Sequence, residues 1–115
     1  PMVLQTSMSL VASLGYQVEV ADGTDTALAL FDTARKRELE PHLVLTDLTM
    51  PGRDGIALAG ALREREFAGP IVLITGFGDE SAGRAAEAGV TKILQKPIPR
   101  EDLGIAIRKL LDQSD

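Results

Sequence analysis

The sequence contains no cysteine and no tryptophan, and aromatic residues make up only 3% of its 115 residues. Without cysteine the chain has neither disulfide bonds nor thiol chemistry, which fits a reducing compartment. Because aromatic rings are so few, the hydrophobic core has to be built from Leu, Ile, Val and Ala. A chain of this length is expected to form a single domain, residues 1–115.

Positive charge is also scarce, since 12 Lys and Arg residues stand against 17 Asp and Glu residues and give a formal net charge of −5. Nucleic acids and anionic membranes are bound by clustered basic residues, so we expect neither direct nucleic-acid binding nor membrane contact. No apolar run approaches the roughly 20 residues that span a bilayer, and we recognise no basic and apolar leader. These features predict a cytoplasmic globular domain.

Apolar strands alternate with amphipathic helices along the chain. Predicted strands cover residues 16–21, 42–46, 70–75 and 91–95, and predicted helices cover residues 2–14, 26–39, 56–66, 82–89 and 103–111. Before the second helix, Thr24 or Asp25 is suited to be the N-cap. Continuous apolar runs such as residues 71–74 are typical of parallel strands covered on both faces. The order predicts an α/β fold, a doubly wound parallel sheet with helices on both faces.

Polar residues stand at the carboxyl ends of the last three predicted strands. Asp47 follows Leu-Val-Leu-Thr, Thr75 ends Ile-Val-Leu-Ile-Thr, and Lys96 follows Lys-Ile-Leu-Gln. In a parallel sheet these ends meet on one side, where ligands bind. A carboxylate can attack phosphorus, while a hydroxyl and an ammonium hold the phosphoryl oxygens. Each residue alone has a simpler interpretation, as a turn residue, a strand former or a solvated lysine, but the combination indicates phosphoryl transfer.

Three segments resemble the receiver domain of two-component response regulators: LVLTDLTMPGRDG, IVLITG and ILQKPI. The resemblance implies a flavodoxin-like fold, with Asp47 as the phosphoacceptor, Thr75 at the hydroxyl position and Lys96 at the lysine position. It implies that a partner histidine kinase or histidine phosphotransfer protein donates the phosphoryl group from a phosphohistidine. Phosphorylation would then switch the loop and helix that follow Thr75.

The beginning of the sequence departs from that family. Receiver domains begin with a strand that ends in an acidic pair, and Pro1 resembles the position just after that pair. We therefore expect the first strand to be missing and the domain to be N-terminally incomplete. Three explanations are open for the missing strand: the chain is a fragment of a longer polypeptide, the strand is supplied from elsewhere, or the sheet is rearranged by swapping between copies. We favour the first explanation.

The resemblance also names a metal, Mg²⁺, which the acidic pair and the phosphoacceptor hold together. In this chain the expected ligands are Asp47 and the backbone carbonyl group of Thr49. Because Mg²⁺ prefers an octahedron of oxygen ligands, we predict weak Mg²⁺ binding and poor self-phosphorylation. A second departure is Ile93, which stands where family members often carry an aromatic residue whose rotation reports phosphorylation. Isoleucine has no ring to rotate, so the output would rest on loop and helix shifts instead, and the simpler interpretation is that Ile93 fills the core.

The sequence allows two alternative functions. The absent acidic pair favours a pseudo-receiver, which is not phosphorylated and acts as a binding or dimerisation module, but Asp47, Thr75 and Lys96 oppose it. A magnesium phosphatase of the haloacid dehalogenase type needs a second Asp where this chain has Thr49. The sequence leaves open whether the domain is an autodephosphorylating enzyme, a homodimer, a part of a hybrid histidine kinase or a stand-alone or DNA-linked regulator.

Overall fold

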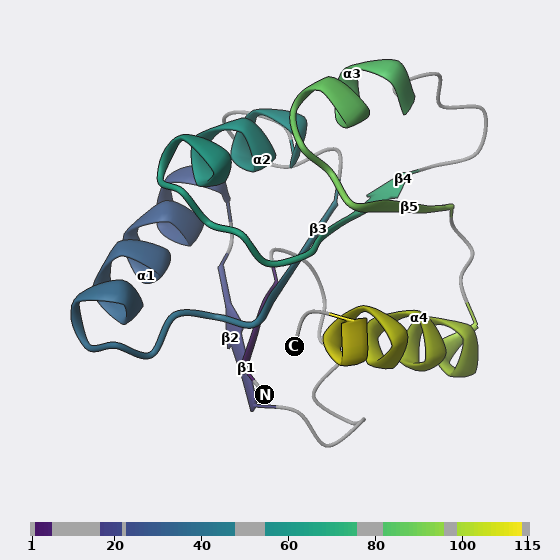
Figure 1. The fold of residues 1–115 in the computed structure, drawn as a ribbon, viewed down its shortest axis with the longest axis horizontal. Coiled ribbons are helices and arrows are strands. Elements are labelled where there is room, and N and C mark those ends of the chain that lie inside the picture. The colour runs from purple at the N-terminus through teal and green to yellow at the C-terminus, as the bar shows by residue number, and fades with distance from the viewer. Residues whose placement is uncertain are drawn as a thin grey trace.

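The computed structural model describes residues 2–5, 17–21, 23–47, 55–75, 82–95 and 99–113. The strands are β1 (Met2–Gln5), β2 (Gln17–Val20), β3 (Leu43–Asp47), β4 (Ile71–Thr75) and β5 (Lys92–Gln95), and the helices are α1 (Thr24–Lys36), α2 (Gly55–Glu64), α3 (Ala82–Glu87) and α4 (Arg100–Gln113). From β2 onward, strands and helices alternate along the described parts of the chain (Figure 1).

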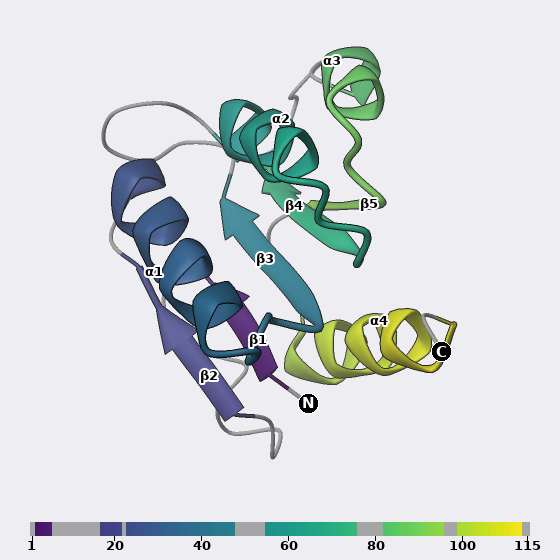
Figure 2. The same ribbon diagram turned by 60° about the vertical axis from the view of Figure 1, so that its left-hand side comes forward.

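The strands form one parallel sheet of five strands in the order β2-β1-β3-β4-β5. Helices α1, α2 and α3 lie over one face of this sheet, and α4 lies over the other (Figures 1 and 2). Because every pairing is parallel, the carboxyl ends of all five strands lie at the same edge of the sheet. The predicted fold class, a flavodoxin-like doubly wound parallel sheet with helices on both faces, is confirmed.

The prediction that the first strand is missing is wrong. Residues Met2–Gln5 form β1, which lies between β2 and β3 and pairs with both. The helical spacing of apolar residues over 2–14 was the misleading signal. A strand at this place gives the amide and carbonyl groups of β2 and β3 their partners, and that requirement outweighs local periodicity. Residues 6–14 of the predicted helix lie outside the described residues.

Helix α1 begins at Thr24 rather than at residue 26, and its N-cap is neither Thr24 nor Asp25. The N-cap is Gly23, which has an extended backbone and makes no side-chain cap hydrogen bond. The amide of Ala27 donates to the carbonyl oxygen of Gly23 at 3.0 Å and closes the first turn. Asp25 lies in that turn, where its negative charge interacts favourably with the positive end of the helix dipole.

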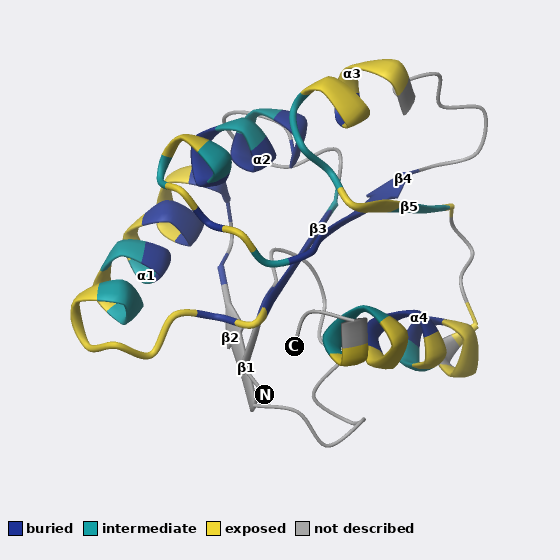
Figure 3. Cartoon of the chain, in the orientation of Figure 1, coloured by how far each residue is buried: buried dark blue, intermediate teal, exposed yellow. Residues whose placement is uncertain are grey.

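Alternate residues of the central strands point into opposite helical layers. On β3, Leu43 and Leu45 pack in the cluster that contains α4, whereas Val44 packs in the cluster that contains α1 and α2. On β4, Val72 and Ile74 join the α4 cluster, and Leu73 joins residues of α2 and α3. Figure 3 shows both strands largely buried, and only the last residue of β3, Asp47, is half-buried. Burial on both faces explains why these strands are apolar in sequence up to their carboxyl ends.

A half-buried arginine, Arg63 near the end of α2, joins three segments. Its Nη1 donates to the carbonyl oxygens of Phe67 at 2.6 Å and Gly69 at 2.8 Å. Its Nε and Nη2 donate to the carbonyl oxygen of Gly89 at 3.1 Å and 2.8 Å. Burial lowers the pKa of Arg63 from its ordinary value, and hydrogen bonds from a charged donor are stronger than neutral ones. This arrangement, the Arg63 clamp, ties the turn after α3 to the end of α2.

Candidate functional site

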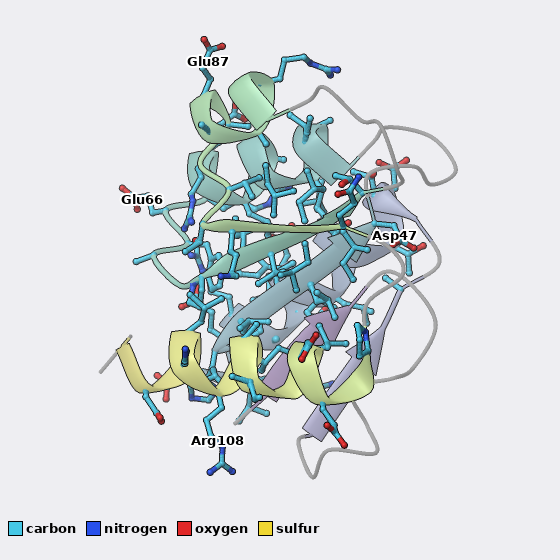
Figure 4. The ribbon with its side chains drawn as sticks, turned by 90° about the vertical axis from the view of Figure 1, so that its right-hand side faces the viewer. Asp47, Glu66, Glu87 and Arg108 are labelled. Atoms are coloured by element: carbon cyan, nitrogen blue, oxygen red, sulfur yellow. The ribbon has the colours of Figure 1, made fainter. Side chains whose placement is uncertain are left out.

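The candidate site lies at the carboxyl ends of β3 and β4, which end in Asp47 and Thr75. Asp47 is in register with Ile74, so Thr75 lies one step further along the neighbouring strand. Thr75 is buried, with 6% of its surface exposed, and the Oδ1 atom of the half-buried Asp47 is also buried. Figure 4 shows Asp47 on the side of the molecule opposite Glu66. Two of the four predicted site residues, Asp47 and Thr75, therefore end adjacent strands at the same edge of the sheet.

The other predicted site residues, Lys96 and Thr49, lie outside the described residues. Gln95, which directly precedes Lys96, ends β5 and pairs with Thr75. The last described residue of β5 is thus next to the end of β4. The presence of the Lys96 ammonium and the Thr49 carbonyl group at the site stays a prediction.

One residue that the sequence analysis did not single out, Thr46, also belongs to this region. Its side chain is fully buried, at 0% exposed. Its Oγ1 donates a hydrogen bond to the backbone carbonyl oxygen of Asp47 at 3.0 Å. The signal in the sequence is a hydroxyl directly after the apolar run of β3 and directly before the strand-end acid.

Helix α2 begins against the end of β3. A Cβ atom placed on Gly55, the first residue of α2, would collide with the backbone carbonyl oxygen of Asp47. The same atom would lie 2.8 Å from Cδ1 of Leu73. Glycine at this position therefore allows the helix to start beside the peptide of the candidate acceptor.

This close approach predicts opposite results for two glycines of the same helix. Gly55→Ala is expected to lower the free energy of unfolding by about 2 kcal/mol, because the new methyl group has to displace backbone atoms of β3. Gly60→Ala is the matched control, because a Cβ on Gly60 meets nothing within 4 Å. It is expected to raise stability by about 0.5–1 kcal/mol. Urea unfolding followed by circular dichroism measures both, and equal effects would contradict the close packing.

The residues present supply part of what a magnesium site needs. Among the described residues, no group of three or more His, Asp or Glu side chains is arranged to hold a metal ion. Asp47 does place a carboxylate at the carboxyl end of the sheet. Mg²⁺ often takes only one or two carboxylates and completes its octahedron with water. The described donor set is therefore compatible with a hydrated ion held weakly.

Ile93 lies on β5, at the border of a small hydrophobic cluster. It is half-buried against a cluster formed by Ile56, Leu73 and Ala85, from α2, β4 and α3. This packing agrees with the simpler interpretation of Ile93 as a side chain that packs against the core. In the same described part of the chain, we find no helix of the length and hydrophobicity required to cross a membrane.

Sequence comparison identifies relatives over nearly the whole chain. The family model for the response regulator receiver domain matches residues 1–108. The positive alginate biosynthesis regulatory protein of Pseudomonas aeruginosa is 38% identical over 112 residues, which are 95% of this chain and 43% of that protein. The transcriptional regulatory protein ResD of Bacillus subtilis is 32% identical over 97 residues, which are 84% of this chain and 38% of that protein. The chain thus spans less than half the length of these two relatives.

Solved structures show the same fold. The receiver domain of the Francisella response regulator 1452 superimposes with a TM-score of 0.85 at 22% identity, covering 100% of this chain and 99% of that one. The receiver domain of the TMAO respiratory system response regulator TorR gives a TM-score of 0.83 at 23% identity, covering 99% and 98%.

Proposed function

Because this chain belongs to the response regulator receiver domain family, we propose that Asp47 is the residue on which this signalling domain accepts its phosphoryl group. Receiver domains interact with histidine kinases or histidine phosphotransfer proteins, which carry the phosphoryl donor. The observation that supports Asp47 is its place at the end of β3, one register step from the buried Thr75 at the end of β4.

The proposed reaction is a transfer from nitrogen to oxygen. A carboxylate oxygen of Asp47 attacks phosphorus, and the phosphorus–nitrogen bond of the partner's phosphohistidine breaks. The partner's histidine is the leaving group, and Asp47 becomes an acyl phosphate. The Thr75 hydroxyl donates to a phosphoryl oxygen, and the Lys96 ammonium neutralises the developing charge. The new contact with Thr75 then biases the loop and helix α3, which follow β4, between two states.

We expect Mg²⁺ to bind weakly, with Asp47 and the Thr49 backbone carbonyl as the ligands from this chain. When bound, the ion would neutralise charge on the transferred group. Calorimetric titration should show weak binding to the wild type, with a further loss in Asp47→Asn. Tight binding, or binding that Asp47→Asn leaves unchanged, would contradict this assignment.

Intact mass spectrometry tests the proposed function. The chain is incubated at saturating Mg²⁺ with acetyl phosphate, and separately with a phosphorylated histidine phosphotransfer protein. We expect a slow mass gain of one phosphoryl group with the first donor and a faster gain with the second. No gain with either donor would instead support the non-phosphorylated binding module.

The relatives suggest how the domain is used. Two of them are named as regulators, one of them transcriptional, and both are more than twice as long as the matched region. We propose that nucleic-acid contact in such a protein comes from another domain, since this chain carries a net charge of −5. We also propose that the domain is cytoplasmic. Light scattering before and after phosphorylation tests whether it forms a homodimer.

A further inference from the structure

We propose that Thr46 is a positioning residue that fixes the Asp47 peptide for phosphoryl transfer, a role that rests on the proposed function of Asp47. The Thr46 Oγ1 donates to the backbone carbonyl oxygen of Asp47 at 3.0 Å. Thr46 itself is fully buried and in register with Leu73. Its hydroxyl is therefore in the interior of the sheet and acts on the backbone of the acceptor residue.

The surroundings of the Asp47 carbonyl group explain why this bond matters. The other residues of β3 before Asp47 are the apolar Leu43, Val44 and Leu45, all buried. A buried hydroxyl costs free energy unless it makes a hydrogen bond, so a hydroxyl in such a strand needs a partner. The same carbonyl oxygen lies so close to Gly55 that no Cβ fits there. Hence the Asp47 peptide is held by the Thr46 hydroxyl and by the first residue of α2.

Holding this peptide restricts the backbone of Asp47 at the point where the strand ends. The direction of the carboxylate depends on that backbone, and phosphoryl transfer requires the attacking oxygen to line up with phosphorus. Thr46 does not reach the phosphoryl group in this account, unlike Thr75. Its contribution is therefore expected in the maximal rate and not in the affinity for the donor.

Three variants separate positioning from stability. Thr46→Val keeps the shape of the side chain but removes the donor, and Thr46→Ser keeps the donor. Thr91→Val is the matched control, because the Thr91 Oγ1 accepts a hydrogen bond from the amide of Ile71 at 3.0 Å, at the amino ends of β4 and β5. Thr91→Val makes the same chemical change as Thr46→Val, but at the end of the strands opposite to Asp47.

The measurement is the phosphorylation rate as a function of acetyl phosphate concentration at saturating Mg²⁺, together with the thermal unfolding temperature of each variant. Thr46→Val is expected to lower the maximal rate about fivefold to tenfold, as for the loss of one orienting hydrogen bond, and to leave the half-saturating donor concentration unchanged. Thr46→Ser should restore most of the rate. Thr91→Val should lower the unfolding temperature but keep the wild-type rate.

Several results would overturn the role of Thr46. A Thr46→Val rate within twofold of the wild type would do so, as would a Thr46→Ser rate as low as that of Thr46→Val. A similar loss of rate in Thr91→Val would show that general destabilisation is responsible. None of these results affects the proposed function of Asp47, which the Asp47→Asn variant tests separately. A wild type that takes no phosphoryl group overturns both proposals.

Discussion

Asp47→Asn is expected to abolish phosphorylation, with a rate reduced by more than about a hundredfold. The amide oxygen of asparagine is a poor nucleophile and cannot form a stable acyl phosphate, whereas its size matches that of aspartate. The variant should therefore fold normally and show no mass gain with acetyl phosphate. Circular dichroism checks the fold, and intact mass spectrometry measures the phosphorylated fraction.

Asp102→Asn is the control for this variant. Asp102 is an exposed acid in the first turn of α4. Its removal changes the net charge by the same amount but leaves the carboxyl end of β3 unaltered. We expect wild-type phosphorylation in this control. A mass gain that survives Asp47→Asn, or that is lost equally in both variants, would be incompatible with Asp47 as the acceptor.

Arg63→Met is expected to lower the free energy of unfolding by about 3 kcal/mol, because several hydrogen bonds from a charged donor are lost and carbonyl groups are left without them. The three carbonyl oxygens belong to Phe67, Gly69 and Gly89, which lie in two different turns. The guanidinium also lies over the Phe67 ring, 5.7 Å from its centroid. Lysine has a single ammonium and cannot reproduce this fork, so Arg63→Lys should recover only part of the loss.

Arg65 offers a matched comparison on the same helix end. Its Nε bonds Asp32 at 3.0 Å, with 33% and 47% of the two side chains exposed. Exposed ion pairs contribute only about 0–1 kcal/mol, so Arg65→Met should have a small effect. Urea unfolding followed by circular dichroism compares the two variants. Equal losses would show that the Arg63 clamp has no special role.

Much of the fold could be predicted from the sequence. The uniformly apolar segments of β3 and β4 and the helices between them predicted a parallel sheet, since both faces of these strands are buried. The first strand could not be predicted from local pattern. Strand β1 is only four residues long. Its place in the sheet is decided by the backbone amide and carbonyl groups of β2 and β3, which need hydrogen-bond partners.

The candidate site divides in the same way. Asp47 and Thr75 could be predicted because each stands at the end of a largely apolar segment, and parallel strands bring such ends together. The structural role of Arg63, away from this site, could not be predicted, because one of its carbonyl partners is 26 residues away in the chain. The bond from Thr46 was also missed, since a threonine in a strand is ordinarily explained by strand propensity alone.

Chemical mapping of the phosphorylated carboxylate identifies the acceptor residue itself. Borohydride reduces an aspartyl acyl phosphate to homoserine, and peptide mass spectrometry then locates the modified residue. After treatment with a phosphorylated histidine phosphotransfer protein, we predict homoserine at position 47 and at no other acid. Homoserine at a different aspartate, or an unmodified Asp47 in a chain that has gained a phosphoryl group, would contradict it.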